Sequence, residues 1–173
     1  MNARDAPAGA APLRPRRATE QDIPGVVDCL QAAFAPYRSQ YTPAAYADTV
    51  PSPATVGERL RTMSVWVVET PPGIIVGTLA GARRTAEEGH LRGMAVRPER
   101  QGTGIAGALL VGALQHLRSL GCRRVTLDTT PPLGRARRFY ERNGFRRSGT
   151  VTDYFGMPLV EYAFELGGAP PPR

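Results

Sequence analysis

The glycines Gly102, Gly104 and Gly107 stand close together where a long, apolar-striped helix is expected to begin. Glycine lets the backbone approach a ligand that any Cβ would keep away. The helix start adds free N–H groups and the positive end of the helix dipole, and both favour an anion at that point. This segment therefore predicts a loop that holds a phosphate or pyrophosphate group.

Two other phosphate-binding motifs have glycines at similar spacing. A P-loop requires Lys and then Ser or Thr directly after its last glycine, whereas this chain has Ala108 and Leu109 there and contains no lysine. The dinucleotide fingerprint is met literally by residues 102–107, and Asp128 closes the next expected strand at a suitable distance. The loop alone does not decide between a dinucleotide site and another phosphate site.

The context of the loop resembles the acyl-CoA-binding signature of the GNAT superfamily of N-acetyltransferases. That signature is Gln or Arg, two residues, Gly, one residue, and Gly or Ala, and Gln101 to Ala106 match it. Five residues, 97–101, separate the expected strand from Gly102, unlike the abrupt turn of a dinucleotide fold. A second block, AxxFYExxGF at residues 136–145, resembles the downstream helix of the same family. The resemblance covers roughly residues 13–166.

The resemblance implies the acyl-CoA N-acyltransferase fold, an α/β (α+β) domain with a mixed, mostly antiparallel sheet of six to seven strands flanked by about four helices. Apolar periodicity predicts the matching order of a strand, three helices, three strands, a helix, a strand, a helix and two strands. We expect the domain at residues 13–166. The segments 1–12 and 167–173 offer little to bury and are predicted to be flexible tails.

The resemblance also implies that acetyl-CoA is the acyl donor and assigns residues to it. The backbone of the strand at 91–96 would bind the pantetheine arm like an added strand, through Met94, Ala95 and Val96. The phosphates would lie against the loop and the helix start. The residues expected there are Gln101, Gly102, Thr103, Gly104, Ile105, Ala106 and Gly107. No metal is expected.

Two catalytic functions need candidates. Tyr140 matches the general acid of the family, and a phenol of pKa about 10 can protonate a departing thiolate; a packing role on an amphipathic helix is the alternative. Glu87 and Glu88, in the polar segment expected before the strand at Leu91, are the candidate bases for the acceptor ammonium, with Glu69 third. Solvated loop charges are the alternative for each.

The sequence also offers candidate residues for the acceptor pocket, and it departs from the family pattern at one position. Tyr37 and Tyr41, with Tyr46, are candidate substrate contacts, because the resemblance puts this region in a wall of the acceptor pocket; packing beneath a surface loop is the alternative. Seven residues before Tyr140, where the family often has Asn, stands Leu133. Its contact with the coenzyme is therefore lost, or supplied by a residue of the segment 128–130.

Charge and composition limit the classes of partner that the chain can be expected to bind. The net charge is +7 and every basic residue is Arg, which together with abundant Ala, Gly and Pro is typical of a GC-rich, bacterial genome. Residues 92–147 carry twelve Arg against three acids, whereas residues 18–91 carry five Arg against eight acids. The positive charge thus concentrates where coenzyme A phosphates would bind, and nucleic acid is not expected. The acidic half weakly favours a cationic amine as acceptor, from a small molecule or a peptide.

Three function classes remain for the chain: an acetyl-CoA-dependent N-acetyltransferase acting on a primary amine, a catalytically silent acyl-CoA-binding sensor, and a small NAD(P)-binding oxidoreductase. The last two strands could support a homodimer. No apolar run has the roughly 18 residues of a membrane span, and no signal peptide is evident, so no membrane partner and a cytoplasmic location are expected.

Overall fold

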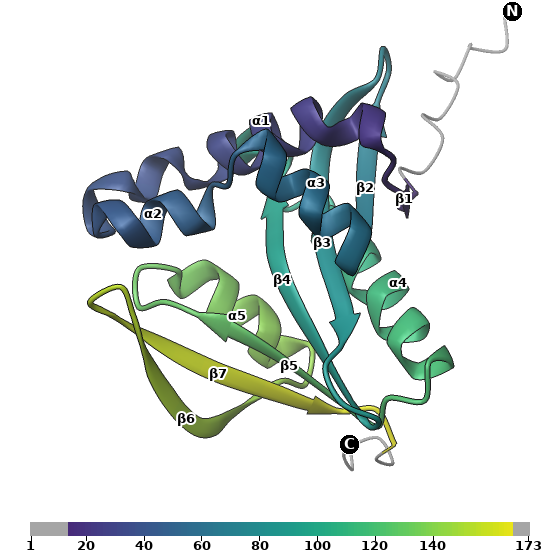
Figure 1. Cartoon of the computed structure of the whole chain (residues 1–173), viewed down its shortest axis with the longest axis vertical. Coiled ribbons are helices and arrows are strands. Elements are labelled where there is room, and N and C mark those ends of the chain that lie inside the picture. Colours follow the sequence, from purple (N-terminus) through teal and green to yellow (C-terminus); the bar gives the residue numbers. More distant parts are fainter. Residues whose placement is uncertain (1–13, 168–173) are drawn as a thin grey trace, which may run out of the picture.

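The computed structural model of the chain describes residues 14–167, and its elements follow the predicted order (Figure 1). The strands are β1 (Arg16–Arg17), β2 (Ser64–Thr70), β3 (Ile74–Arg83), β4 (Glu88–Val96), β5 (Arg124–Thr129), β6 (Arg146–Tyr154) and β7 (Met157–Glu165). The helices are α1 (Ile23–Phe34), α2 (Pro43–Thr49), α3 (Pro53–Thr62), α4 (Ile105–Ser119) and α5 (Gly134–Arg142), with short 3-10 turns at Glu20–Asp22, Ala35–Gln40 and Pro98–Arg100. The tail predicted at 1–12 lies outside the described residues, as does the tail predicted at 167–173 apart from its first residue.

The described strands form one mixed sheet of seven in the order β1-β2-β3-β4-β5-β7-β6. All neighbours are antiparallel except β4 and β5, which are parallel. This confirms the predicted fold class. It also excludes the doubly wound parallel sheet that a dinucleotide-binding chain requires.

The two central strands pair over only part of their length. β4 pairs with β5 from Glu88 to Leu91, and the pairing then ends. Beyond that point β4 continues along β3 as far as Val96, while β5 continues along β7 as far as Thr129. The strands therefore diverge, and Figure 1 shows the opening between β4 and the β5–β7–β6 part of the sheet.

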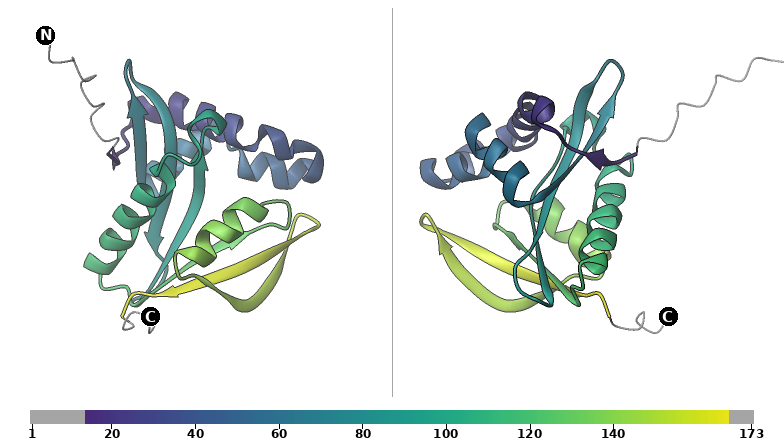
Figure 2. Two further views of the ribbon diagram at one scale, coloured as in Figure 1. Left: turned by 180° about the vertical axis from the view of Figure 1, so that it is seen from behind. Right: turned by 45° about the vertical axis from the view of Figure 1, so that its right-hand side comes forward.

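Helices cover both faces of the sheet. α1 and α3 lie on one face and α4 on the other, as the two views in Figure 2 show. The predicted apolar stripe of α4 is confirmed, since its buried residues are Ile105, Leu109, Leu110, Ala113 and Leu117. Burying a leucine side chain contributes about 1.5–3 kcal/mol. Close approach of α4 to β3 requires Gly77, because a Cβ there would lie 2.5 Å from Cγ2 of Ile105.

Two strand boundaries differ from the prediction. The first strand is only Arg16–Arg17, and β4 begins at Glu88 rather than at Leu91. Glu88 can occupy a strand because its carboxylate lies 3.6 Å from Nη1 of Arg124, the residue opposite it on β5. The polar segment expected before Leu91 is thus shorter than expected, a tight turn at 84–87 between β3 and β4. None of the described helices is long and apolar enough to cross a membrane.

Candidate active site

A cavity of about 820 Å³ lies in the opening between β4 and β5 and reaches helices on both faces of the sheet. Its walls come from α1, α2, α3, the end of β4, the start of α4, the end of β5, α5 and the β6–β7 hairpin. It exists because the parallel pairing stops at Leu91 and Leu127, so the two strand ends leave a space that no side chain of the sheet fills.

The edge of β4 that faces the opening is available to a ligand. Beyond Leu91 the strand pairs only with β3, so the described residues offer no strand partner for the other edge. The register also slips there: Thr78 and Ala80 of β3 face Ala95 and Arg92, and Gly93 has φ 65°. This bulge changes the direction of the backbone just before Met94, Ala95 and Val96. All three residues line the cavity.

The glycine loop forms another wall of the cavity. Gly102 and Gly104 have φ of 81° and 86°, which a side chain would disfavour. Gly104 is the N-cap of α4 and supplies no side-chain oxygen, so the first N–H groups of that helix stay available to an anion. Of the expected loop residues, Thr103 alone does not line the cavity; its exposed hydroxyl donates to the carbonyl of Arg100 at 2.6 Å.

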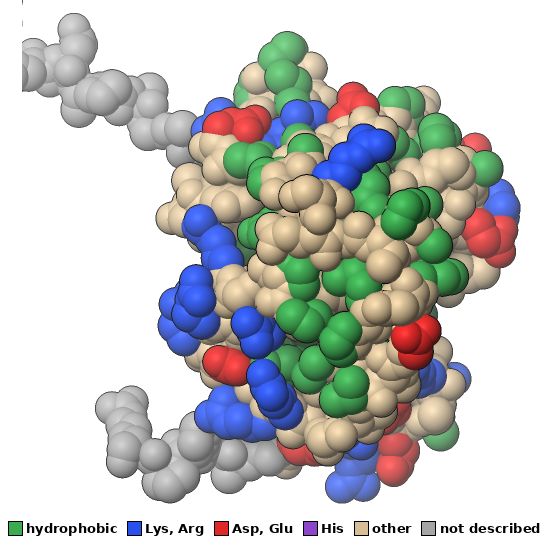
Figure 3. All heavy atoms as spheres, turned by 90° about the vertical axis from the view of Figure 1, so that its left-hand side faces the viewer, with side chains coloured by type: hydrophobic (Ala, Val, Ile, Leu, Met, Phe, Trp, Pro, Cys, Tyr) green, Lys and Arg blue, Asp and Glu red, His purple; other side chains and the backbone are tan. Residues whose placement is uncertain are grey.

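Arginines surround the glycine loop. Arg100, Arg135 and Arg142 line the same cavity as the loop. In Figure 3, arginine side chains gather along one edge of the face that looks into the opening, beside exposed hydrophobic side chains. Positive charge therefore lies beside the phosphate-fitting backbone, as the charge distribution along the sequence predicted.

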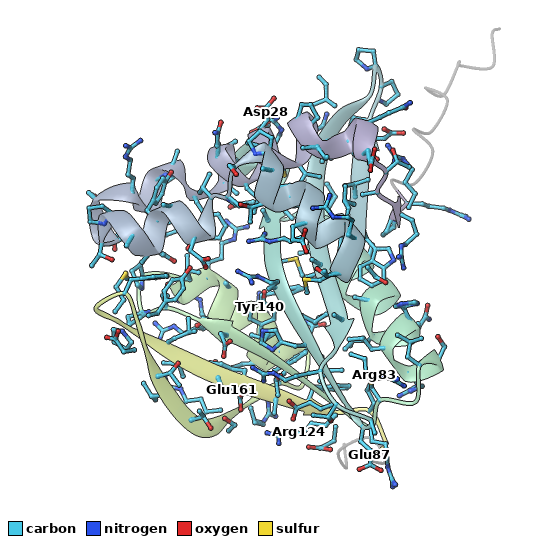
Figure 4. All side chains as sticks on the ribbon, viewed as in Figure 1. Asp28, Arg83, Glu87, Arg124, Tyr140 and Glu161 are labelled. Carbon is cyan, nitrogen blue, oxygen red and sulfur yellow. The ribbon has the colours of Figure 1, made fainter. Side chains whose placement is uncertain are left out.

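Tyr140 lies on α5 and is held by aromatic packing. Its ring meets Phe139 at 5.5 Å and Phe145 at 5.7 Å between centroids, and the residue is 7% exposed. Burial raises the pKa of its hydroxyl well above the ordinary value. The phenol therefore stays protonated at any pH at which the protein works, and it lines the cavity between β4 and β5 (Figure 4).

Asp128 of β5 and His90 of β4 lie close together at the edge of the opening, where the pairing of the two strands ends. His90 Nε2 lies 3.6 Å from Oδ2 of Asp128, and His90 Nδ1 lies 2.9 Å from the Thr126 hydroxyl. Burial raises the pKa of the Asp128 carboxyl. The charge of His90 lowers this pKa, and the charge of Glu161, which stands opposite Asp128 on β7, raises it further. Burial also disfavours the charged form of His90 and so lowers its pKa. The sequence could not show this pair, because it depends on the parallel register of β4 and β5.

The glutamates expected to act as base lie elsewhere. Glu87 is 70% exposed in the turn just before β4, far from Tyr140 in Figure 4, and its carboxylate lies 3.7 Å from Nη1 of Arg123. Glu88 lies between Arg84 and Arg124. Glu69 is on β2, paired with Arg16. None of the three lines the cavity. For Glu87 and Glu88 the reason is that they stand at the end of β4 that is still paired with β5, whereas Glu69 stands on β2, away from both central strands.

Two of the three tyrosines expected at the acceptor wall, Tyr37 and Tyr41, line the cavity. Tyr37 is half-buried, whereas Tyr41 is 8% exposed with its hydroxyl 2.5 Å from that of Thr130. Tyr46 packs on Tyr41 but does not line the cavity. Leu133 lines the cavity in place of the family's Asn, and the nearby Thr129 hydroxyl is buried with no hydrogen-bond partner among the described residues.

This combination of a strand splay, a glycine loop at a helix start and a buried tyrosine agrees with a comparison of protein families. The model of the Acetyltransferase (GNAT) family matches residues 26–145. The chain belongs to the GNAT acetyltransferase family. A search of curated proteins found no match to this chain. Within residues 14–167 no group of three or more His, Cys, Asp or Glu side chains could hold a metal ion.

Solved structures share the fold at low identity. PaiA N-acetyltransferase of Thermoplasma acidophilum, in complex with coenzyme A, is 14% identical with a TM-score of 0.73, over 86% of this chain and 97% of that one. The ribosomal-protein-S18-alanine N-acetyltransferase of Escherichia coli is 17% identical with a TM-score of 0.71, over 91% and 96%. YncA of Salmonella typhimurium, with its cofactor acetyl-CoA, is 17% identical with a TM-score of 0.68, over 94% and 99%.

Proposed function

We propose that this GNAT protein transfers an acetyl group from acetyl-CoA to a primary amine of an acceptor, by direct attack of the amine on the thioester. The observation that carries the proposal is the continuous cavity. It joins a phosphate-fitting loop on one face of the sheet to a protonated tyrosine and a carboxylate–imidazole pair at the strand opening. Donor, proton donor and proton acceptor can thus meet in one place.

The residues present fit the coenzyme. The N–H groups at the start of α4 and the arginines beside it suit the phosphates, while the open edge of β4 at Met94 to Val96 suits the amides of the pantetheine arm. The orphan hydroxyl of Thr129 is available to replace the contact that Leu133 cannot make. When bound, acetyl-CoA supplies a thioester that is already activated, so the protein has only to position it, take a proton from the amine and stabilise the departing sulfur.

Replacing Gly104 with Val tests the loop. No atom lies within 4 Å of a Cβ built at Gly104, so the effect comes from its φ of 86° rather than from a clash. A side chain disfavours that conformation by about 1–2 kcal/mol, so the loop relaxes away from it in the free protein and has to be restored on binding. We therefore expect coenzyme A to bind about tenfold more weakly by titration calorimetry. Gly112→Ala, inside α4 with equally open space, is the control and should leave affinity unchanged. Equal affinity in a folded Gly104→Val protein would contradict the proposed phosphate site.

The acceptor proton is proposed to go to Asp128. An alkyl ammonium has a pKa of about 10, so it must lose a proton before it attacks. A carboxylate with a raised pKa is a better base than an ordinary aspartate. If the Thr126 hydroxyl donates to the carbonyl of Gly89, 3.4 Å away, its oxygen accepts from Nδ1 of His90. Nε2 then faces Asp128 without a hydrogen, so His90 can take the proton onward once Asp128 has received it from the ammonium.

The departing sulfur is proposed to be stabilised by the Tyr140 hydroxyl. The hydroxyl is the acidic group that α5 brings to the cavity, and aromatic packing on both sides fixes its direction. A thiol of pKa about 8.5 is a stronger acid than this phenol. Full transfer is therefore uphill, and the hydroxyl acts mainly by donating a hydrogen bond to the sulfur as negative charge develops there.

Release of free thiol from acetyl-CoA, measured with a panel of amines, tests the function. We expect at least one amine to accelerate thiol release, and the acetylated product to appear by mass spectrometry in equal amount. In calorimetry acetyl-CoA should bind and NADH should not. Tight binding of acetyl-CoA with no amine-dependent release would instead support the silent binding module.

A further inference from the structure

A buried arginine lies in the cavity on the face of the sheet away from the phosphate loop. Arg59 of α3 is 8% exposed and lines the cavity. Its Nη1 lies 3.0 Å from the position that a Cβ of Gly93 would occupy, so the guanidinium reaches β4 at the strand opening. α4, with the glycine loop, covers the opposite face (Figure 2). Arg59 therefore faces the acceptor end of the cavity.

The protein leaves this guanidinium largely without partners. Among the described residues Arg59 forms no salt bridge, its buried Nε has no hydrogen-bond acceptor, and Nη2 reaches the carbonyl of Asp48 only at 3.5 Å. A buried charge without a counter-ion is costly, and such groups are normally paired. Burial, reinforced by the charge of Arg92, lowers the pKa of Arg59 to about 10, so it is still cationic at neutral pH.

The nearest carboxylate is already engaged. Asp48 accepts a hydrogen bond from the Tyr154 hydroxyl at 2.6 Å and lies 3.3 Å from Nη2 of Arg92. Its single negative charge therefore balances one of the two arginines at most. The set of Arg59, Arg92 and Asp48 keeps a net positive charge inside the cavity, although the segment 18–91 as a whole is acidic.

We propose that Arg59 and Arg92 bind a carboxylate on the acceptor, so that the amine to be acetylated belongs to a free amino acid or a close analogue. The planar guanidinium matches a carboxylate in two parallel hydrogen bonds, which supplies the missing counter-ion and fixes the orientation of the ligand. The same ligand can then turn its amino group toward Asp128 in the strand opening. This inference rests on the proposed function, and it replaces the cationic acceptor that overall charge suggested.

Matched acceptor pairs test the proposal. Each L-amino acid of a panel is compared with its own amide, which keeps the amine and side chain but lacks the carboxylate charge. For the wild-type protein we expect kcat/KM about 10- to 100-fold higher for the acid than for the amide, the range of a charged hydrogen-bond pair. In Arg59→Met this preference should fall by about tenfold, because only the more exposed Arg92 remains, and in Arg59→Lys it should be partly kept.

Arg61→Met is the matched control. Arg61 lies on the same helix, its side chain is 64% exposed and paired with Glu58, and it is not in the cavity wall. It should keep the preference for the acid. Because Arg59→Met removes an uncompensated buried charge, its melting temperature should be no lower than that of wild type, and its affinity for coenzyme A should not change. A loss of coenzyme affinity would place Arg59 in the donor site and overturn the proposal.

Binding measured without turnover separates this proposal from the proposed function. Calorimetry of the coenzyme A complex should show that amino acids bind and their amides bind much more weakly. If amino acids bind in this way but no thiol is released, the carboxylate subsite stands and the enzymatic function fails. If thiol is released equally with acids and amides, the function stands and the carboxylate subsite is disproved.

Discussion

Tyr140→Phe is expected to lower kcat by about 100-fold, the lower end of the range for proton transfer at a reacting group. The lower end applies because burial has already raised the pKa of the hydroxyl, which makes it a weaker acid. Coenzyme affinity should hardly change, because the ring keeps its packing on Phe139 and Phe145 and loses only one oxygen. Steady-state thiol release, with calorimetry for coenzyme A, measures both quantities.

A second tyrosine supplies the control for this substitution. Tyr46 belongs to the aromatic group of α2 but does not line the cavity, so Tyr46→Phe should retain full turnover. A rise in KM for the amine, with kcat unchanged in Tyr140→Phe, would assign Tyr140 to acceptor binding instead. Full activity in Tyr140→Phe would leave it a packing residue.

The geometry of the proposed donor half of the site was predictable because its signals are local. A positive φ at Gly104, a helix start without a cap and an apolar stripe are each set by residues near one another in sequence. The fold class followed from the same periodicities, together with the resemblance to the family. The predicted loop residues accordingly line the cavity, with Thr103 as the exception.

The acceptor half was not predictable in the same way, because its signals are long-range. Asp128 meets His90 only through the parallel register that aligns His90 with Thr126. Glu87 and Glu88 were chosen as candidate bases because they lie in a polar segment next to the central strand β4. That segment adjoins the end of β4 that is paired with β5, and the cavity lies at the other end. A strand has two ends, and the residues alone did not show which one opens.

The buried, unpaired state of Arg59 is the clearest example of a feature that the sequence alone did not predict. Along α3 Arg59 stands three residues after the buried Val56, a spacing that places both on one face of the helix. An arginine at such a position is normally interpreted as a solvated side chain. Only the burial of its guanidinium, and the engagement of Asp48 by two other groups, show that its charge lacks a partner.

The proposed base predicts a pH dependence for Asp128→Asn. In the wild-type protein kcat/KM should rise with pH as Asp128 loses its proton, and the raised pKa places this rise at higher pH than for an exposed aspartate. His90, Glu161, Arg84 and Arg92 also face this carboxylate, so the rise belongs to a coupled group rather than to one residue. The Asn variant keeps the shape of the side chain but cannot accept the proton.

Near neutral pH we therefore expect Asp128→Asn to lower kcat/KM by about 100-fold. The defect should shrink as the pH approaches the amine pKa of about 10, because the free amine then forms without a base. Asp153→Asn, in the β6–β7 hairpin outside the cavity, should follow the wild-type profile. A constant loss at every pH would show that Asp128 orients the acceptor or the strand opening without removing a proton. The dependence of the defect on pH, rather than its size, thus decides whether this carboxylate is the base.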